Sequence, residues 1–122
     1  AAAGLLHAAQ ALAARRAPPR LWLVTTGAAV DAPRDAASLA AASLWGLGRG
    51  IAAEHPELAF TSVDLAAPGE PELDALAEVL RSDDRAEQVG LRGGARLVPR
   101  VAPLPLPSAA APPVAGAWLV TG

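Results

Sequence analysis

The chain has 122 residues, the size of one domain, and 52% of them are hydrophobic, although much of that share is alanine. With 10 basic and 12 acidic residues, its formal charge of −2 argues against a nucleic-acid-binding protein, and its scattered arginines form no polybasic membrane-binding segment. It has no cysteine, which excludes disulfides and thiolate chemistry, and it shows neither a signal-peptide pattern nor an apolar run long enough to span a membrane. We therefore expect a cytoplasmic protein with no nucleic-acid or membrane partner.

The first third of the chain predicts a helix, a strand and a second helix. The helix covers residues 4–16, and Pro18 and Pro19 end it. Residues 21–25 form a continuous apolar run, which is typical of a strand covered on both faces. Asp35 is placed to cap the second helix, which extends to about residue 54. The apolar stripe of the first helix comprises Leu5, Leu6, Ala9, Leu12 and Ala13.

The second helix is expected to pack closely on its neighbours. Leu44, Leu47 and Ile51 are spaced by three and four residues and so share one helical face. Replacing Leu47 or Ile51 with alanine should then cost about 2–5 kcal/mol. The same segment contains several small residues, which would let another backbone approach, and His55-Pro56 ends it. These small residues are Gly46, Gly48, Gly50, Ala52 and Ala53.

A strand over residues 58–65 is expected next, followed by a helix that has Pro71 in its first turn. Two strands, 88–92 and 95–101, surround Gly93-Gly94, which is a hairpin signal. Strands that alternate with helices favour a parallel sheet with right-handed crossovers, and the hairpin would add an antiparallel strand at one edge. The buried stripe of the helix that begins near Pro71 is predicted to be Leu73, Leu76, Ala77 and Leu80.

The last part of the chain differs in composition. Residues 99–113 are rich in proline and alanine, which predicts a stiff tether without regular structure. Residues 117–120 form a short apolar strand pattern, and Thr121-Gly122 opens a turn. A strand buried on both faces needs covering helices, so we expect this strand to belong to a second sheet.

Two features suggest a nucleotide site, and both have a simpler explanation. Gly46, Gly48 and Gly50 match GxGxG, but a dinucleotide loop needs its glycines between a strand and a helix N-terminus, and here they lie inside a helix pattern. Close helix–sheet packing is therefore the better interpretation. Asp64 ends a strand, as a ribose-binding acid does, yet capping of the next turn is the favoured role for an aspartate without a phosphate loop before it.

Other candidate groups are also assigned to structure. His7 and His55 lack a triad pattern or metal-ligand spacing, and the Asp83-Asp84 pair fits an exposed helix end. The three tryptophans, Trp22, Trp45 and Trp118, fall on strand and helix patterns and are expected to pack rather than stack on a ligand. Four hydroxyl residues, Thr25, Thr26, Ser43 and Ser62, have no GxSxG context. We therefore predict no catalytic residue and no metal site.

Four segments in order resemble the structural subdomain of a ketoreductase from a modular type I polyketide synthase. They are LWLVTTGA (21–28), SLWGLGRGIAAEHPEL followed by VDL (43–58 and 63–65), EQVGLRGGARLVPRV (87–101) and AWLVTG (117–122). The resemblance implies an α/β fold: a truncated Rossmann-like, mostly parallel sheet flanked by helices, with a C-terminal β-hairpin and the first strand of a second Rossmann subdomain. The expected domains are the structural subdomain (1–101), a linker (102–113) and the start of the catalytic subdomain (114–122).

By that resemblance, the chain stabilises a catalytic half and is not an enzyme on its own. The complete domain would reduce a β-ketoacyl group on an acyl carrier protein to a β-hydroxyacyl group with NADPH. Thr121 and Gly122 look like the first residues of the NADPH phosphate loop. The expected partners are the catalytic subdomain of the same polypeptide, the acyl carrier protein and neighbouring synthase domains. Two alternatives remain open: the scaffold half of a degenerate, non-reducing ketoreductase, and a stand-alone nucleotide-binding enzyme.

Overall fold

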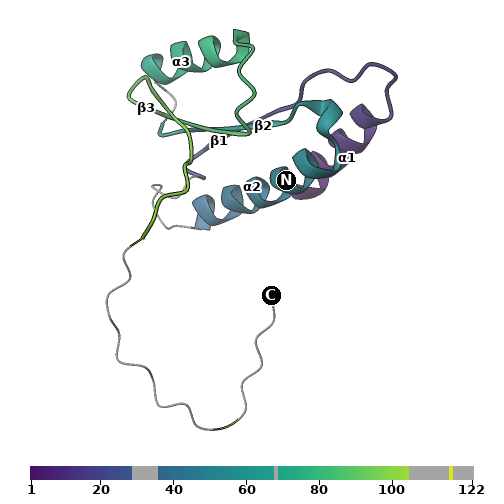
Figure 1. The fold of residues 1–122 in the computed structure, drawn as a ribbon. Coiled ribbons are helices and arrows are strands. Elements are labelled where there is room, and N and C mark those ends of the chain that lie inside the picture. The colour runs from purple at the N-terminus through teal and green to yellow at the C-terminus, as the bar shows by residue number, and fades with distance from the viewer. Residues whose placement is uncertain (29–35, 68, 105–115, 117–122) are drawn as a thin grey trace.

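A computed structural model describes residues 1–28, 36–67, 69–104 and 116 of the chain (Figure 1). Asp35, the expected linker beyond residue 104, and the expected strand over 117–120 lie outside these residues. The described elements are α1 (Ala2–Ala13), β1 (Trp22–Thr26), α2 (Ala36–Glu54), the 3₁₀ helix η1 (Pro56–Leu58), β2 (Thr61–Leu65), α3 (Glu70–Arg81), β3 (Gln88–Arg92) and β4 (Ala95–Leu97). None of the helices in the described part of the chain is long and apolar enough to cross a membrane.

The four strands form one sheet in the order β1-β2-β3-β4. The first three are parallel, and β4 pairs antiparallel with β3. Gly93 and Gly94 make the hairpin turn with φ angles of 56° and 78°, a conformation that glycine adopts without steric cost. The sheet thus confirms the truncated Rossmann-like fold with its hairpin.

The two helices that connect the parallel strands lie on opposite faces of the sheet (Figure 1). Phe60 packs with Ile51 of α2, whereas Val63 and Leu65 pack with α3. The β1–α2–β2 and β2–α3–β3 connections both move to the next strand in the same direction across the sheet. Because their helices lie on opposite faces, one crossover is right-handed and the other is left-handed. The expectation that all crossovers are right-handed is therefore wrong.

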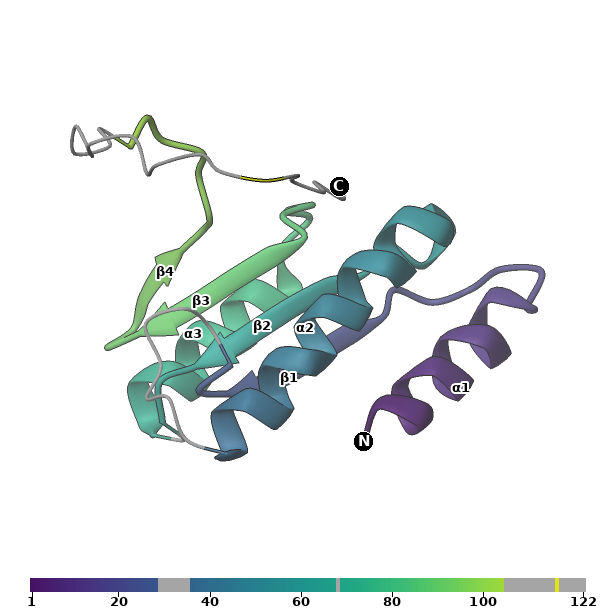
Figure 2. The ribbon, with the colours of Figure 1, turned by 90° about the horizontal axis from the view of Figure 1, so that it is seen from below.

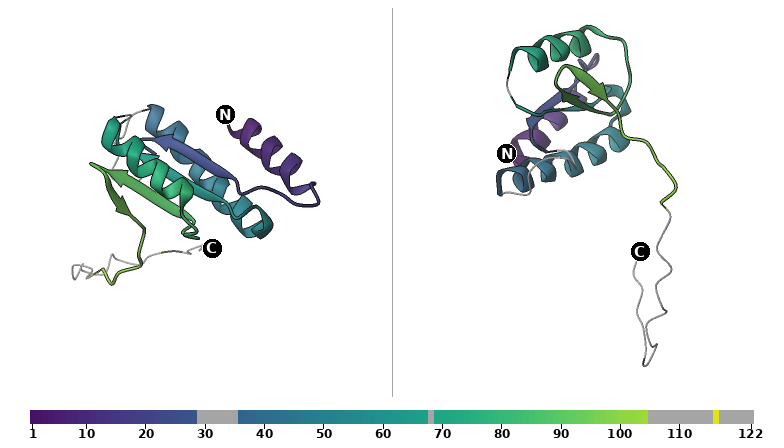
Figure 3. Two further views of the ribbon diagram at one scale, coloured as in Figure 1. Left: turned by 90° about the horizontal axis from the view of Figure 1, so that it is seen from above. Right: turned by 90° about the vertical axis from the view of Figure 1, so that its left-hand side faces the viewer.

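In this arrangement, the helices of residues 1–28, 36–67 and 69–104 cover only half of each sheet face. On one face, α2 contacts β1 and β2, and α1 packs beside α2 (Figure 2). On the other face, α3 packs over β2 and β3 (Figure 3). Val24 of the edge strand β1 consequently remains 43% exposed, so the prediction of a strand covered on both faces is wrong for β1. In contrast, every residue of β2 is buried.

Two element boundaries differ from the sequence prediction. The strand expected from residue 58 begins at Thr61, because residues 56–58 form η1 and Ala59 takes a left-handed conformation with φ of 43°. Proline at the first position suits such a turn, since its missing N–H is not needed there. The last strand, expected to reach residue 101, ends at Leu97.

The buried stripe predicted for α3 is rotated. Leu73 and Leu80 are 51% and 43% exposed, whereas Ala75, Val79 and Glu72 are buried. Glu72 turns inward because its Oε1 accepts a hydrogen bond of 2.8 Å from the backbone N–H of Gly93 in the hairpin turn. This bond places the start of α3 against the hairpin and moves the leucine stripe partly into solvent.

The helix α2 approaches the sheet most closely at Gly48. A Cβ atom added there would lie 2.6 Å from Cε1 of Phe60, whereas one added at Gly50 would meet nothing within 4 Å. The free energy of unfolding of Gly48→Ala is therefore expected to be about 1–3 kcal/mol lower than that of Gly50→Ala, because only the first variant overpacks the core. Urea denaturation of the two variants measures this difference, and equal midpoints would mean that Phe60 moves aside freely.

Candidate functional site

A buried polar network lies on the face of the sheet that α2 covers. The carboxylate of Asp64, with 0% exposure, accepts hydrogen bonds from Thr25 Oγ1 (2.8 Å) and from the backbone N–H of Ala28 (2.7 Å) on Oδ1. Its Oδ2 pairs with the Arg92 guanidinium at 2.9 Å. Trp45 Nε1 donates to Thr25 Oγ1 at 2.9 Å. The network therefore ties α2 to β1, β2 and β3.

Strand periodicity explains why these side chains meet. Thr25 is opposite Asp64 in the β1–β2 register, and Asp64 is opposite Gly90 of β3. Side chains two residues apart on a strand share a face, so Gln88, Gly90 and Arg92 line the same side as Asp64. Arg92 also donates from Nη1 to the backbone oxygen of Asp64 at 3.0 Å, which fixes its guanidinium at the end of β3.

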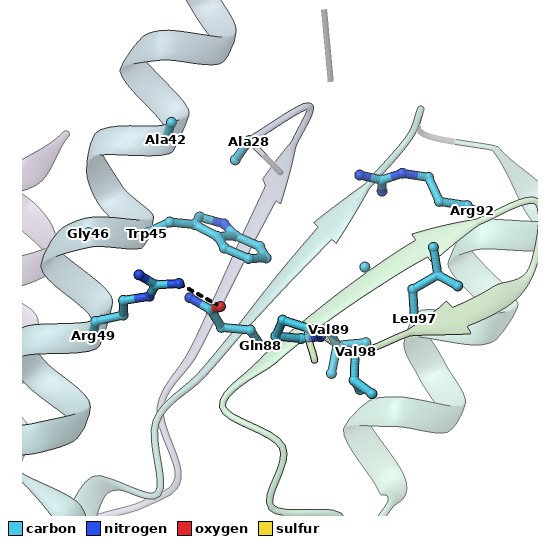
Figure 4. Close-up of a pocket in the computed structure, with 12 residues that line it drawn as sticks. Ala28, Ala42, Trp45, Gly46, Arg49, Gln88, Val89, Arg92, Leu97 and Val98 are labelled. Atoms are coloured by element: carbon cyan, nitrogen blue, oxygen red, sulfur yellow. Dashed lines mark hydrogen bonds between the residues drawn. The ribbon is translucent and has the colours of Figure 1, made fainter. Parts of the chain in front are cut away.

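A cavity of about 610 Å³ adjoins this network, between α2 and the β3–β4 hairpin (Figure 4). The indole of Trp45 projects into it from α2. Arg49 lies at one end, where its Nη2 donates to Gln88 Oε1 at 3.3 Å, and Arg92 lies at the other. Leu97 and Val98 form the wall on the hairpin side. The cavity thus combines apolar walls with two guanidinium groups.

The arrangement is suited to binding rather than to proton transfer or nucleophilic attack. The described residues that line the cavity include no carboxylate, and Asp64 of the adjoining network is already hydrogen-bonded and paired with Arg92. Among the residues that the structure describes, no group of three or more His, Cys, Asp or Glu side chains could hold a metal ion. The exposed guanidinium of Arg49, which donates to the neutral amide of Gln88, would favour a negatively charged group on an occupant.

The glycine cluster does not form a phosphate loop. Gly46, Gly48 and Gly50 lie within α2, well past its first turn. Gly48 packs closely against Phe60, as expected. A Cβ atom added at Gly46 or Gly50 would meet no atom within 4 Å. These glycines therefore offer no free N–H groups to a pyrophosphate.

Asp64 has long-range partners besides any local one. Its carboxylate accepts from Ala28, 36 residues earlier in the chain, and pairs with Arg92, 28 residues later. Sequence reasoning weighed only local partners for it. It also missed Arg49 and Arg92 as cavity residues, although two signals were present: Arg49 follows Trp45 by four residues on a helix, and Arg92 follows Gln88 by four residues on a strand.

The histidines have structural positions. His7 is exposed on α1. His55 follows α2, and its Nδ1 lies 2.9 Å from Glu57 Oε1; hydrogen bonds from the backbone N–H of Glu57 and from His55 lower the pKa of the Glu57 carboxyl. Neither histidine lies near a described serine and carboxylate in a triad arrangement.

The charged residues at the end of α3 build a clamp beneath the sheet edge. Asp83 and Asp84 are exposed, as predicted, and the Asp84 carboxylate pairs with Arg96. Arg20 donates to the backbone oxygen of Asp84 at 2.6 Å, and its guanidinium stacks 3.8 Å above the Trp22 ring. Burial lowers the pKa of Arg20. This clamp joins the start of β1 to the segment between α3 and β3.

The remaining candidate residues either have positions within the fold or lie outside the described residues. Trp22 packs against the core on the α3 face, as expected, whereas Trp45 lines the cavity. Ser43 bonds the backbone oxygen of Ala40, and Ser62 is buried within β2. The expected cofactor residues Thr121 and Gly122, and also Trp118, lie outside the described residues.

A mostly parallel sheet with helices on both faces defines this chain as a Rossmann-like α/β domain, and a cavity lies beside the sheet. The family described as "Polyketide synthase extender module SpnB, Rossmann fold domain" matches residues 1–101. The chain belongs to this family, in agreement with its resemblance to the ketoreductase structural subdomain of a modular polyketide synthase. No solved structure matches it.

Mycobacterial polyketide synthases contain similar segments. One phenolphthiocerol/phthiocerol polyketide synthase polypeptide of Mycobacterium tuberculosis (strain ATCC 25618 / H37Rv) is 43% identical over 90 residues, which are 74% of this chain and 4% of that protein. A second polypeptide of the phenolphthiocerol/phthiocerol synthase, from M. tuberculosis (strain CDC 1551 / Oshkosh), is 38% identical over 92 residues, 74% of this chain and 6% of that protein. The chain thus spans only a small part of the length of these relatives, which are large polyketide synthase subunits.

Proposed function

We propose that this chain is the structural half of a polyketide synthase ketoreductase and that it stabilises the catalytic half. The observation that carries the proposal is the family match over residues 1–101. It is supported by the position of the GxGxG glycines, which lie within α2 and not in a loop between a strand and a helix. A Rossmann-like domain without a phosphate loop in its described part is suited to support and not to cofactor binding. The described residues therefore do not fit NADPH.

In this proposal, the complete domain reduces β-ketoacyl groups on an acyl carrier protein to β-hydroxyacyl groups with NADPH. Thr121 and Gly122 would begin the phosphate loop of the catalytic half, and the catalytic residues would belong to that half. The relatives are parts of polyketide synthases, which supports neighbouring synthase domains as partners. The alternative is that the same half belongs to a degenerate ketoreductase, which organises neighbouring domains without reducing a substrate.

The experiment that separates these two functions uses the complete ketoreductase domain. Purified domain is mixed with NADPH and a β-ketoacyl thioester, and the loss of NADPH absorbance is followed together with the formation of the hydroxy product. Reduction supports the proposal. A folded domain that neither binds NADPH nor forms product would identify a non-reducing scaffold and overturn the reductive role.

The 122-residue chain alone is expected to bind NADPH more weakly than a dissociation constant of about 1 mM, equivalent to roughly −4 kcal/mol. The reason is that several backbone N–H groups and a helix N-terminus are needed to hold the phosphates, and the glycines of α2 cannot provide them. Calorimetric titration with NADPH measures this affinity. Tighter binding would favour the third possibility, a stand-alone nucleotide-binding protein.

A further inference from the structure

The cavity beside Trp45 results from the way the two helices divide the sheet. Because α2 covers β1 and β2, none of the helices in the described part of the chain lies over the same face of β3 and β4. The floor of this open half includes Gly90, whose lack of a side chain leaves the sheet surface accessible. The cavity of about 610 Å³ is therefore an uncovered part of a sheet and not an enclosed pocket in the core.

The side chains around this opening have the composition of a protein interface. Trp45 is held in a fixed position by its bond to Thr25, and Leu97, on the hairpin side of the cavity, is 51% exposed. Arg49 is exposed and Arg92 is anchored by Asp64. Tryptophan and arginine are the residues most enriched at the energetic centres of interfaces, especially around an apolar cavity. Arg49, whose described partner is the neutral amide of Gln88, also favours an occupant that carries negative charge at its edge.

The course of the chain indicates what reaches this opening. After β4, Val98 and Pro99 line the cavity directly. Val101 and Leu104 then extend away from the fold with exposures of 104% and 78%. The chain therefore leaves the fold at the rim of the cavity, at Pro99, and residues 101–104 lead away from it. Any domain joined to this chain at its C-terminal end is held near the opening at high effective concentration.

We propose that the cavity between α2 and the β3–β4 hairpin is the docking surface for the catalytic half that follows this chain, an inference that rests on the proposed function. The occupant is a segment of that half with an apolar side chain, which packs between Trp45 and Leu97, and a carboxylate, which pairs with Arg49. Such contacts would hold the two halves in a fixed orientation, beyond what a tether alone provides.

The test compares the 122-residue chain with the complete ketoreductase domain by hydroxyl-radical footprinting and mass spectrometry. Labelling of Trp45 and Leu97 is expected to fall about fivefold in the complete domain, as for a half-exposed side chain that becomes part of an interface core. In the complete domain, Arg49→Glu should restore most of this labelling. The control Arg16→Glu, which changes an exposed arginine that does not line the cavity, should leave it low. Melting of the 122-residue variants verifies that both still fold.

Three results would overturn the inference. These are equal labelling of Trp45 and Leu97 in the chain and in the complete domain, protection that Arg49→Glu does not change, and protection that appears only after carrier protein or a small anion is added. The reduction assay is scored separately. Protection without reduction would keep the docking surface and reject the reductive function, whereas reduction without protection would do the reverse.

Discussion

Asp64→Ala is expected to lower the free energy of unfolding of the chain by about 3–5 kcal/mol, the range for breaking a buried ion pair by removing one partner. The carboxylate has 0% exposure, and its loss would remove one charge of the ion pair that it forms with the Arg92 guanidinium, 19% exposed, at 2.9 Å. The same change removes the acceptor for Thr25 Oγ1 and for the N–H of Ala28. Urea denaturation followed by tryptophan fluorescence measures the effect.

Two further variants separate the charge of Asp64 from its hydrogen bonds. Asp64→Asn keeps an oxygen acceptor but not the charge, so it should be less destabilising than Asp64→Ala. The double variant Asp64→Leu with Arg92→Met removes both charges together, and it should recover part of the loss because no unpaired ion remains buried. If all single variants stayed within about 0.5 kcal/mol of the wild type, as ordinary surface substitutions do, the network would contribute nothing to stability.

Ile51→Ala should cost about 2–5 kcal/mol, as for other buried aliphatic side chains truncated to alanine. Ile51 is 3% exposed and belongs to the core that joins α1, α2 and η1 through Ala9, Leu58 and Phe60. Shortening it would leave a cavity where these elements meet. The shift of the chemical denaturation midpoint gives the change in stability when the slope of unfolding free energy against denaturant concentration is the same in both proteins.

Leu47→Ala is the matched comparison on the same helix. Leu47 packs against the same core but is only partly buried, so its truncation should cost less than that of Ile51. The two costs were expected to be similar from the helical pattern alone. A larger loss for Leu47 than for Ile51 would mean that the helix is rotated relative to the sheet.

The order of elements could be predicted from the sequence because each depends on local signals. Proline pairs end helices, Gly93-Gly94 makes the hairpin turn, and apolar runs mark the strands. Helix phase was predicted correctly for Ile51 but not for Leu73 and Leu80, because the bond between Glu72 and the hairpin turn rotates α3. That bond joins residues 21 positions apart, which a helical pattern does not reveal.

The polar network and the cavity depend still more on long-range geometry. Asp64 meets Ala28 and Arg92 only after β1 and β3 have paired on either side of β2. The cavity exists because the two crossovers place their helices on opposite faces, which contradicts the common preference for right-handed connections. No pattern within a single element specifies that choice, so the site could be found only in the folded structure.

The position of β1 at the edge of the sheet has a consequence for aggregation. Its sequence, WLVTT, contains no charge, proline or bulge, which are the features that normally prevent edge strands from pairing with other molecules. Val24 adds an apolar side chain that α3 does not cover. An unprotected strand of this kind is a template for intermolecular sheet extension. Within a synthase, polypeptide that shields this edge would keep neighbouring modules from associating through it.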